Sequence, residues 1–520
     1  MPVRSLVRGL LPPGLALIAG GCVRGPDAPP MPALGEGPRP EALLVQMSGN
    51  VPLPGGEPVA PGWQRVVPAP GVTAEDALRR LSARPGVLWA ERSARYRVQG
   101  FPAPQVPAPV RILMALGDPD DPRLGECWGH ARVGAQSAWG KTRGASEMLV
   151  GVVDTGLETR HEDMLGGRVQ AGPNLVQPGR SPEDEVGHGT HVAGTIGATG
   201  NNGIGLAGIS HGARVVSIKV LGGDGSGSVE DIAAGIRAAT AAGVRVLNLS
   251  LGGNQPSRLL AEAVADAVRH DIVVVAAAGN DGDTRPTYPA SLPGVLAVGA
   301  TDRQDHKATF SNHGTYVGIA GPGTDILSTT GGAYRTYSGT SMASPHVAAA
   351  AALLRSVRPD LPASRIVALL KSSTVPASGF GFAVPRLDVA QALTLAEAEA
   401  TGSLPLPPPA GGEPLPSPAP SPADPSGMIS AIEVRQPSRG ILHLAWSTRE
   451  PARCALGMRT GEGTAWRLQA HSRDGLRHEV LVPEVGEAGS LQARVTARLG
   501  DGKRLAGPWT PLADGRASGV

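Results

Sequence analysis

The sequence has little cysteine, little lysine and little net charge. Only three of its 520 residues are cysteine, and none lies in the Gly- and His-rich setting typical of a cysteine nucleophile. The 47 basic residues, five of them lysine, nearly balance the 45 acidic ones and leave a formal net charge of +2. Basic and acidic residues are interspersed, so we expect no attraction to nucleic acid. Beyond the N-terminal segment, no stretch reaches the roughly 18 uninterrupted apolar residues that a membrane-spanning helix needs.

The first 22 residues have the organisation of an export signal. Arg4 and Arg8 precede an apolar stretch at 10–19, and two glycines and then Cys22 follow it. A small-residue run before a cysteine resembles a bacterial lipobox, whose cysteine becomes the lipidated N-terminus of the mature chain. An ordinary secretory signal is the alternative. The sequence therefore predicts a bacterial protein that is lipid-anchored in the cell envelope or extracellular.

The two remaining cysteines allow two interpretations. If Cys22 is lipidated, Cys127 and Cys454 form an even pair in an exported protein, and a disulfide can join them. They lie in different predicted domains, however, so two free thiols packed as small apolar side chains are the alternative.

Length and proline-rich segments predict several domains. At about 150 residues per domain, a chain of this length corresponds to roughly three. We predict a signal peptide at 1–22, a linker at 23–41, a small α+β unit at 42–98, a connector at 99–117, an α/β domain at 118–397, a proline-rich linker at 398–427 and a β-sandwich at 428–520.

The region 118–397 alternates apolar strand patterns with helical ones. Continuous apolar runs predict buried parallel strands at 149–153, 215–220, 244–249 and 272–277. Capping residues and periodicity predict helices at 228–242, 257–269, 341–355 and 363–372. This alternation is typical of an α/β fold, a parallel sheet with helices on both faces. Chemistry in such sheets gathers at the carboxyl ends of strands, where Asp154, Ser250 and Asn280 are expected.

Three motifs in this region each carry a polar residue typical of nucleophilic catalysis. Residues 149–156 (LVGVVDTG) end a buried strand in Asp154, and 187–194 (GHGTHVAG) place His188 where a loop meets a helix. Residues 339–348 (GTSMASPHVA) place Ser341 at a strand-to-helix turn. The order Asp, His, Ser along the chain distinguishes subtilisin-type hydrolases from chymotrypsin-type and α/β-hydrolase enzymes. The chain therefore resembles the subtilase family of serine endopeptidases.

The resemblance implies a role for each of these residues. Ser341 would attack the carbonyl carbon, His188 would move the proton, and Asp154 would orient the imidazole. Asn280, in the segment 276–282 (AAAGNDG), matches the family's oxyanion-hole asparagine. No cofactor is expected for catalysis.

Each residue also has a simpler interpretation. Asp154 and Ser341, taken singly, suit caps of turns or helices. His188 and His191 form an HxxH pair, which is typical of metal sites, but no third ligand converges on it. Four residues in the family's order favour the catalytic interpretation over these alternatives.

The resemblance also implies where a substrate binds. An extended peptide would add as a strand between 224–227 (DGSG) and 250–253 (SLGG), held mainly by main-chain hydrogen bonds. No acidic residue is evident in the expected primary pocket, so we expect an apolar or broad side-chain preference. The expected substrate-binding residues are Gly225, Gly227, Ser250, Leu251, Gly252, Ala277, Gly279 and Thr287.

One structural metal site is implied by the resemblance. The segment 200–206 (GNNGIGL) resembles the family's calcium loop. Its ligands would be Asp163, Asn202 and the carbonyl groups of Gly200, Ile204 and Leu206. A Gly-Asn turn without an ion is the alternative.

The unit at 42–98 resembles the family's inhibitory propeptides. A strand at 42–47, a helix that begins after Thr73, and strands at 86–91 and 96–98 would build it. The resemblance implies a zymogen that cuts itself in the proline-rich segment 101–125. A small permanent domain is the alternative.

Short alternating strands after the linker predict a β-sandwich. They lie at 429–433, 440–446, 453–459, 479–482 and 491–498, and the region is similar to fibronectin-type-III modules. The sequence thus predicts an exported, monomeric serine endopeptidase that acts on proteins or peptides and binds its own propeptide. A surface adhesin with a vestigial catalytic domain is the alternative, and it needs none of the four catalytic residues.

Overall fold

The computed structural model describes 41–49, 52–102, 118–373, 375–381 and 384–400, together with the backbone of strands between 433 and 511. The predicted signal peptide with Cys22, nearly all of the first linker and the linker at 398–427 lie outside the described residues, apart from 398–400. Within the described part of the chain, no helix is both long and apolar enough to cross a membrane.

A nine-stranded sheet organises the α/β region, and its neighbours are parallel except for the edge pair β18–β19. The predicted α/β fold with a mostly parallel sheet is confirmed. In spatial order the strands are β18 (Val375–Ala377), β19 (Val384–Arg386), β15 (Val317–Pro322), β14 (Val295–Thr301), β13 (Val273–Ala277), β11 (Val246–Leu249), β7 (Leu149–Asp154), β9 (Arg214–Lys219) and β8 (Val169–Asn174).

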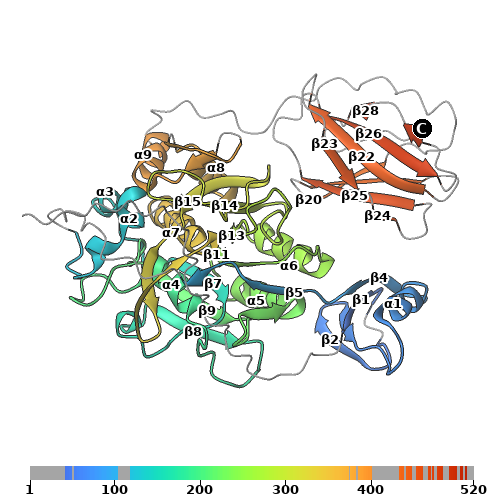
Figure 1. Ribbon diagram of the computed structural model, residues 1–520, viewed down its shortest axis with the longest axis horizontal. Helices are drawn as coiled ribbons and strands as arrows, with labels where there is room; N and C mark the ends of the chain where they lie inside the picture. Colours follow the sequence, from blue (N-terminus) through green and yellow to red (C-terminus); the bar gives the residue numbers. More distant parts are fainter. Residues whose placement is uncertain are drawn as a thin grey trace, which may run out of the picture. The chain divides into compact units, whose positions relative to one another are not determined.

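Helices cover both faces of this sheet (Figure 1). The helices α4 (His188–Gly197) and α7 (Thr340–Val357) pack on one face, and α5 (Val229–Ala241) and α6 (Arg258–Arg269) pack on the other. Alternate residues of a strand serve the two cores: Val273 joins the first and Val274 the second. A strand buried on both sides needs apolar residues throughout, which explains the continuous apolar runs in the sequence.

Side-chain caps begin two of the predicted helices. Ser228 Oγ accepts a hydrogen bond from Asp231 N at the start of α5, and Ser257 Oγ accepts one from Leu260 N at the start of α6. The helix α8 (Ala363–Lys371) also lies where it was predicted. Further elements have weaker sequence signals and were not predicted: α2 (Trp128–Arg132), α3 (Ala135–Trp139), α9 (Val389–Ala400) and the hairpin of β16 (Ile326–Thr330) and β17 (Ala333–Ser338).

The N-terminal region folds into a small sheet with one helix. Its strands in spatial order are β2 (Gly56–Ala60), β3 (Trp63–Val66), β1 (Leu43–Met47) and β4 (Val87–Arg92). The helix α1 (Ala74–Ser82) lies beside β1 and β4 (Figure 1). Thr73 caps it by accepting from Asp76 N, and the sequence predicts this cap.

The expected return of 96–98 to this small sheet is wrong. The strand β5 (Arg95–Val98) pairs instead with β10 (Ser226–Ser228) on one side and β12 (Leu251–Gly252) on the other. Both partners have free edges facing each other, so a strand between them satisfies two rows of backbone groups. The chain then continues as β6 (Phe101–Pro102), which pairs with β17.

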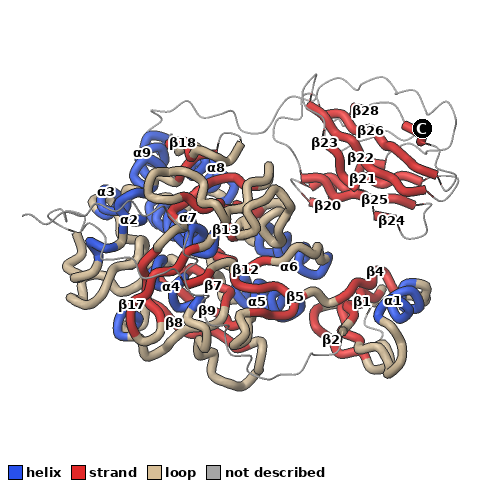
Figure 2. Tube along the Cα trace, viewed as in Figure 1, coloured by secondary structure: helices blue, strands red, loops and turns tan. Residues whose placement is uncertain are grey.

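The C-terminal strands pair into two antiparallel sheets, drawn in red in Figure 2. One has the order β20-β21-β25-β24, and in the other β23, β22, β26 and β27 lie in that order while β28 also pairs with β26. Their bounds are β20 (Glu433–Ser438), β21 (Ile441–Ser447), β22 (Ala452–Thr460), β23 (Trp466–Gln469), β24 (His471–Ser472), β25 (Arg477–Pro483), β26 (Leu491–Leu499), β27 (Arg504–Ala506) and β28 (Thr510–Pro511). The first strand begins at Glu433, and 429–432 lie outside the described residues. The likeness to a fibronectin-type-III module stays a prediction.

Candidate active site

An aspartate and a histidine meet at the carboxyl end of β7. Asp154 is the last residue of that strand, and His188 is the first residue of α4. Asp154 Oδ1 lies 2.7 Å from His188 Nδ1, and both side chains are buried. Thr155 Oγ1 accepts from Gly189 N, which ties the start of α4 to the end of β7. The carboxylate therefore selects the tautomer with a proton on Nδ1 and leaves Nε2 as a base.

Ser341 lies in the first turn of α7, at the same end of the sheet as Asp154 and His188. Its hydroxyl donates to the carbonyl oxygen of Ser250 at 2.8 Å. His188 Nε2 is buried and has no hydrogen-bond partner among the described residues. A Cβ built on Gly100 would lie 3.1 Å from His188 Nε2 and 3.2 Å from Ser341 Cβ, so the two residues are neighbours. The Ser341 hydroxyl is therefore bonded to the Ser250 carbonyl group and not to the nearby imidazole.

Two donors converge near the start of α7. Ser341 N donates to the carbonyl oxygen of Gln99 at 2.8 Å. Asn280 Oδ1 accepts from both the backbone N–H and the hydroxyl of Thr340, each at 2.9 Å, so its Nδ2 faces the opposite way. A Cβ built on Gly339 would clash with Gln99 O and lie 3.2 Å from Asn280 Nδ2. Glycine at 339 thus leaves open the space where an oxyanion would sit between the two donors.

A segment of the chain itself occupies the predicted substrate cleft. Val98 N donates to Gly225 O at 3.0 Å, and Gln99 N donates to Ser250 O at 3.2 Å. In the ladder, Gly227 lies opposite Tyr96, Leu251 opposite Val98 and Gly252 opposite Arg97. The structure therefore brings together the five predicted substrate-binding residues that lie in β10, β12 and the residues just before them.

The expected primary pocket lies beside Gln99. The Gln99 side chain donates through Nε2 to Gly252 O at 3.1 Å. A Cβ built on Gly252 would lie 2.6 Å from Thr287 Cγ2, and one built on Gly279 would lie 2.6 Å from Thr287 Oγ1. Ala277 is buried at the end of β13. Thr287, Gly252 and Gly279 are thus neighbours in this wall.

Asn248 and Ser344 join the site although they were not among the predicted site residues. Ser250 Oγ donates to Ser341 O, accepts from Asn248 Nδ2 and bonds Ser344 Oγ at 2.8 Å. This network fixes the strand end after β11 against the first turn of α7. Only Ser250 of these polar residues stood at a predicted strand end, and the network depends on contacts between residues about 90 positions apart.

His191 does not form a metal pair with His188. His191 Nε2 bonds Ile326 O at 2.9 Å, and its ring stacks on Tyr337 with centroids 4.7 Å apart. Burial lowers the pKa of His191 to about 3. Among the described residues no group of three His, Cys, Asp or Glu side chains is placed to hold a metal ion. His191 is therefore a packed core residue.

The predicted calcium loop folds around Asp163. Asp163 accepts from Asn202 Nδ2 and from Leu206 N, both at 2.9 Å. Asp121, which the sequence did not single out, accepts from the backbone N–H groups of Asn201 and Asn202. Burial raises the pKa of both carboxyl groups, and the charge of a neighbouring aspartate adds to the rise in each.

Two buried carboxylates suit a hard cation such as Ca²⁺. Asn202, however, presents its Nδ2 to Asp163, and its Oδ1 accepts from Ile204 N. The backbone N–H of Leu206 points to Asp163. The prediction instead made the carbonyl group of Leu206 a metal ligand. Ile204 is partly exposed, and Gly200 packs against His211. Asp163 and Asn202 thus lie together, and no metal contact is shown for the carbonyl groups of Gly200, Ile204 and Leu206.

Cys127 is a buried free thiol. Burial raises its pKa, so the thiol stays protonated at neutral pH. The side chain of Cys454 lies outside those described, so a pairing of the two cysteines stays a prediction.

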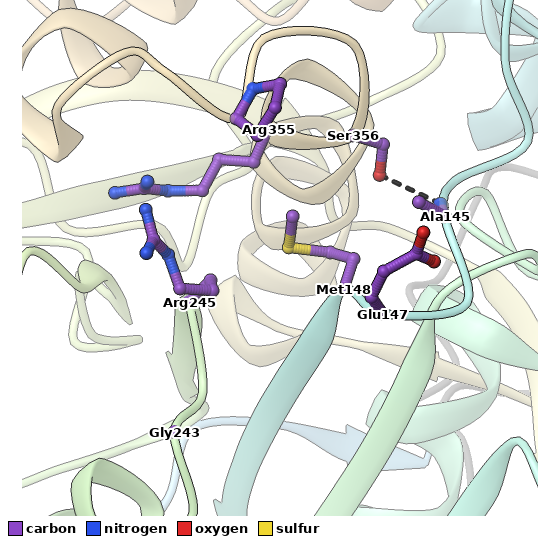
Figure 3. Close-up of a pocket in the computed structure, with 8 residues that line it drawn as sticks. Ala145, Glu147, Met148, Gly243, Arg245, Arg355 and Ser356 are labelled. Atoms are coloured by element: carbon purple, nitrogen blue, oxygen red, sulfur yellow. Dashed lines mark hydrogen bonds between the residues drawn. The ribbon is translucent and has the colours of Figure 1, made fainter.

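A cavity of about 410 Å³ lies apart from this site (Figure 3). It is lined by residues just before β7 and β11 and at the end of α7, so it opens at the amino ends of the strands. Arg245 and Arg355 lie side by side there, and both guanidinium groups bond Asp271 Oδ2. The residues that line the cavity include no nucleophile with a base beside it, unlike the carboxyl edge of the sheet.

Comparison with known proteins agrees with this geometry. Residues 145–396 match the Peptidase_S8 profile, described as the subtilase family. Subtilisin Savinase of Lederbergia lenta is 44% identical over 234 residues, which cover 45% of this chain and 85% of that protein. Thermitase of Thermoactinomyces vulgaris is 40% identical over 265 residues, which cover 51% of this chain and 94% of thermitase.

Similarity extends to a solved structure, that of a protease from Pseudoalteromonas arctica. The match has a TM-score of 0.50 and 31% identity, and it covers 54% of this chain and 100% of the other.

Proposed function

This chain belongs to the subtilase family and is a subtilisin-like serine endopeptidase, and we propose that Asp154, His188, Ser341 and Asn280 carry its peptide hydrolysis. The observation that carries the proposal is the hydrogen bond from Ser341 N to Gln99 O. It marks the point where a peptide carbonyl sits against the nucleophile, with the Asp154–His188 pair beside it.

The reaction follows from these positions. The Ser341 hydroxyl turns from Ser250 O to His188 Nε2, gives up its proton there and attacks the carbonyl carbon. Ser341 N–H and Asn280 Nδ2 stabilise the oxyanion. His188 then protonates the leaving amine, and a water molecule repeats the sequence to release the acyl group. Asp154 holds the Nδ1 proton throughout and stabilises the imidazolium.

We assign the region 42–98 as an inhibitory propeptide. Polar contacts with the two helices α5 and α6 support this assignment. Glu91 accepts from Ser257 Oγ and from the backbone N–H of Arg258 at the start of α6. An anion at a helix N-terminus meets unpaired N–H groups and a favourable dipole. Ser93 Oγ donates to Glu230 at the start of α5.

Apolar contacts support the same assignment. Trp63 is 1% exposed, and its Nε1 donates to Glu262 Oε2 on α6 at 2.8 Å. Leu44 and Trp63 belong to the apolar cluster that also holds residues of α5 and α6. With the propeptide docked, β5 fills the cleft and excludes other substrates. The chain is therefore proposed to be a zymogen that activates itself by cutting this segment.

Export and anchoring are part of the proposal and rest on the sequence alone. The segment 1–22 acts as the signal, and Cys22 carries a lipid or is removed with the signal. If Cys22 is lipidated and the propeptide leaves after cleavage, the lipid leaves with it. Mass spectrometry of the mature N-terminus distinguishes these fates.

A structural calcium ion is proposed for the loop around Asp163, with Asn202, the carbonyl groups of Gly200, Ile204 and Leu206, and Asp121 nearby. The ion would offset the repulsion of two buried carboxylates and would take no part in catalysis. EDTA should lower the melting temperature by about 5 °C or more. The Asp163→Asn variant should lose this response, and equal melting of the wild type with Ca²⁺ and with EDTA would contradict the proposal.

A fluorophosphonate probe tests the catalytic assignment. Processed wild type should be labelled, whereas Ser341→Ala should remain unlabelled and accumulate at full length. Absence of label on processed wild type would overturn the proposal. Equal shortening of both proteins would show that another protease removes the propeptide.

A further inference from the structure

The peptide bond after Gln99 lies between the nucleophile and the base. Gln99 O accepts from Ser341 N at 2.8 Å. A Cβ built on Gly100 would lie 3.1 Å from His188 Nε2 and 3.2 Å from Ser341 Cβ. The chain is paired on both sides of this bond, as β5 before it and β6 after it. A side chain at 100 would crowd both catalytic groups, so glycine lets the bond approach them.

The side chain of Gln99 is recognised by a backbone acceptor. Its Nε2 donates to Gly252 O, and its Cγ lies 3.5 Å from the position of a Cβ built on Gly252. A glutamate here would direct carboxylate oxygens at a carbonyl oxygen, leaving the carbonyl unpaired and the charge partly desolvated. The contact therefore distinguishes an amide from its isosteric acid.

A second side chain of the segment is buried by the peptidase domain. Tyr96 is 1% exposed, and its hydroxyl donates to Gln255 O at 2.5 Å. A Cβ built on Gly253 would lie 2.8 Å from the ring, so glycine there makes room for an aromatic side chain. The side chains of Arg95 and Arg97 are exposed, and the ion pair of Arg95 with Asp224 lies at the surface, where such pairs contribute little. Recognition thus concentrates on Tyr96 and Gln99.

We infer that the chain cuts itself at the bond between Gln99 and Gly100, and that the mature peptidase selects substrates with glutamine before the scissile bond and tyrosine three residues earlier. This inference rests on the proposed function. In the first step the Ser341 Oγ bond to the Gln99 carbonyl carbon forms, and the bond to Gly100 N breaks. The Ser341 proton passes through His188 to Gly100 N, the new amino terminus. Water then cleaves the ester and leaves a carboxylate on Gln99.

This position differs from the cut expected within 101–125 and from the expected apolar or broad preference. Both expectations came from composition, since a proline-rich segment looks accessible and a pocket without acidic residues looks apolar. The amide of Gln99 binds a backbone carbonyl group. Every residue has such a group, so side-chain composition does not predict this contact.

Two measurements on the full chain test the inference. The mature N-terminus of the wild type, read by mass spectrometry, should be Gly100. The variant Gln99→Glu should process about 10- to 100-fold more slowly, because the donor to Gly252 O is lost. The variant Arg84→Ala, which changes an exposed residue of the propeptide, should process at the wild-type rate.

Peptide substrates test selectivity independently of propeptide folding. For the activated wild type, kcat/KM should be about 10- to 100-fold higher for Tyr-Arg-Val-Gln than for Tyr-Arg-Val-Glu or Ala-Arg-Val-Gln anilides. Replacing the arginine by alanine should change kcat/KM by less than about threefold, because that side chain is exposed. A mature N-terminus other than Gly100, or equal values for glutamine and glutamate, would overturn the inference and leave the endopeptidase intact. Wild type that neither processes itself nor takes the probe would overturn the proposed function.

Discussion

The hydroxyl of Ser341 donates to the carbonyl oxygen of Ser250, and His188 Nε2 is left without a partner in the described part of the chain. The Ser341 hydroxyl therefore bonds the strand end at Ser250 while the Ser341 N–H binds the carbonyl oxygen of Gln99. In the proposed mechanism this hydroxyl turns from Ser250 O to His188 Nε2.

The Asp154–His188 contact predicts the effect of Asp154→Asn. An amide at this position can donate to Nδ1, which places the imidazole proton on Nε2 and removes the base. We expect kcat to fall about 10⁴-fold, as it does for the equivalent change in other serine peptidases. Thermal unfolding of the folded protein should shift by only a few degrees. A loss of less than about tenfold would contradict the role assigned to Asp154.

The oxyanion site predicts a separate effect for Asn280→Ala. Removing one preorganised donor should lower kcat about 10²- to 10³-fold with little change in KM, because the donor acts on the developing charge. Steady-state kinetics on a peptide anilide measure both constants. Asn280→Asp is the informative companion, since it keeps the acceptor for Thr340 and removes the donor. Recovery of kcat in that variant would contradict the donor role.

Buried histidines predict acid lability. Burial lowers the pKa of His130 and His191 to about 3 and of His211 and His346 to about 4. In the unfolded chain these groups titrate near pH 6.5, so the unfolded state binds more protons below about that pH. Their contribution to stability is complete above about pH 6.5 and is lost as pH falls toward about 4.

Between about pH 7.5 and 5.5 each of these histidines should reduce the free energy of unfolding by about 1 kcal/mol. Denaturant titrations of Ser341→Ala, which avoid self-digestion, give the slope. The raised carboxyl pKa values of Asp121 and Asp163 act in the opposite sense. Stability independent of pH over this range would refute the prediction.

The contact of Glu91 with α6 predicts faster activation when it is lost. Glu91→Ala removes an acceptor from Ser257 Oγ and Arg258 N, which should weaken the docked propeptide about 10- to 100-fold. After self-cleavage, peptidase activity should appear correspondingly earlier. Glu57→Ala, which removes an exposed ion pair with Arg65, is the matched control and should behave like the wild type. Identical lag times in the two variants would exclude this anchor.

Arg245, Arg355 and Asp271 form an ion cluster at the amino ends of the strands. We predict that breaking this cluster lowers the stability of the protein and leaves its activity unchanged. Arg355 is fully buried, and Asp271 bonds both it and the backbone N–H of Ala363 at the start of α8. Asp271→Ala should therefore cost about 2–4 kcal/mol of unfolding free energy. Its kcat/KM at about 25 °C should match the wild type, because the cluster lies at the opposite edge from Ser341. Unchanged stability would contradict this prediction and would mean that the backbone contacts of Arg355 are enough to stabilise its buried charge.

Much of the α/β domain could be predicted because its signals are local. The strands β7, β11 and β13 are buried on both faces, so their apolar runs are continuous. Ser228 and Ser257 each cap a helix by a hydrogen bond to the residue three positions later. The hairpin β16–β17 and the strands β8, β14, β15, β18 and β19 of the sheet were not predicted.

The sequence by itself determined the chemistry: an aspartate, a histidine, an asparagine and a serine at strand ends and helix starts, in an order that one family shares. Tertiary structure alone decided what lies against them. Segment 96–98 is predicted as an ordinary strand, and nothing local distinguishes a place in the small sheet from one in the cleft. The segment lies in the cleft because it pairs with the backbone edges of β10 and β12, fills the space beside Gly253 and accepts from Ser341 N. These partners come together only when the chain folds.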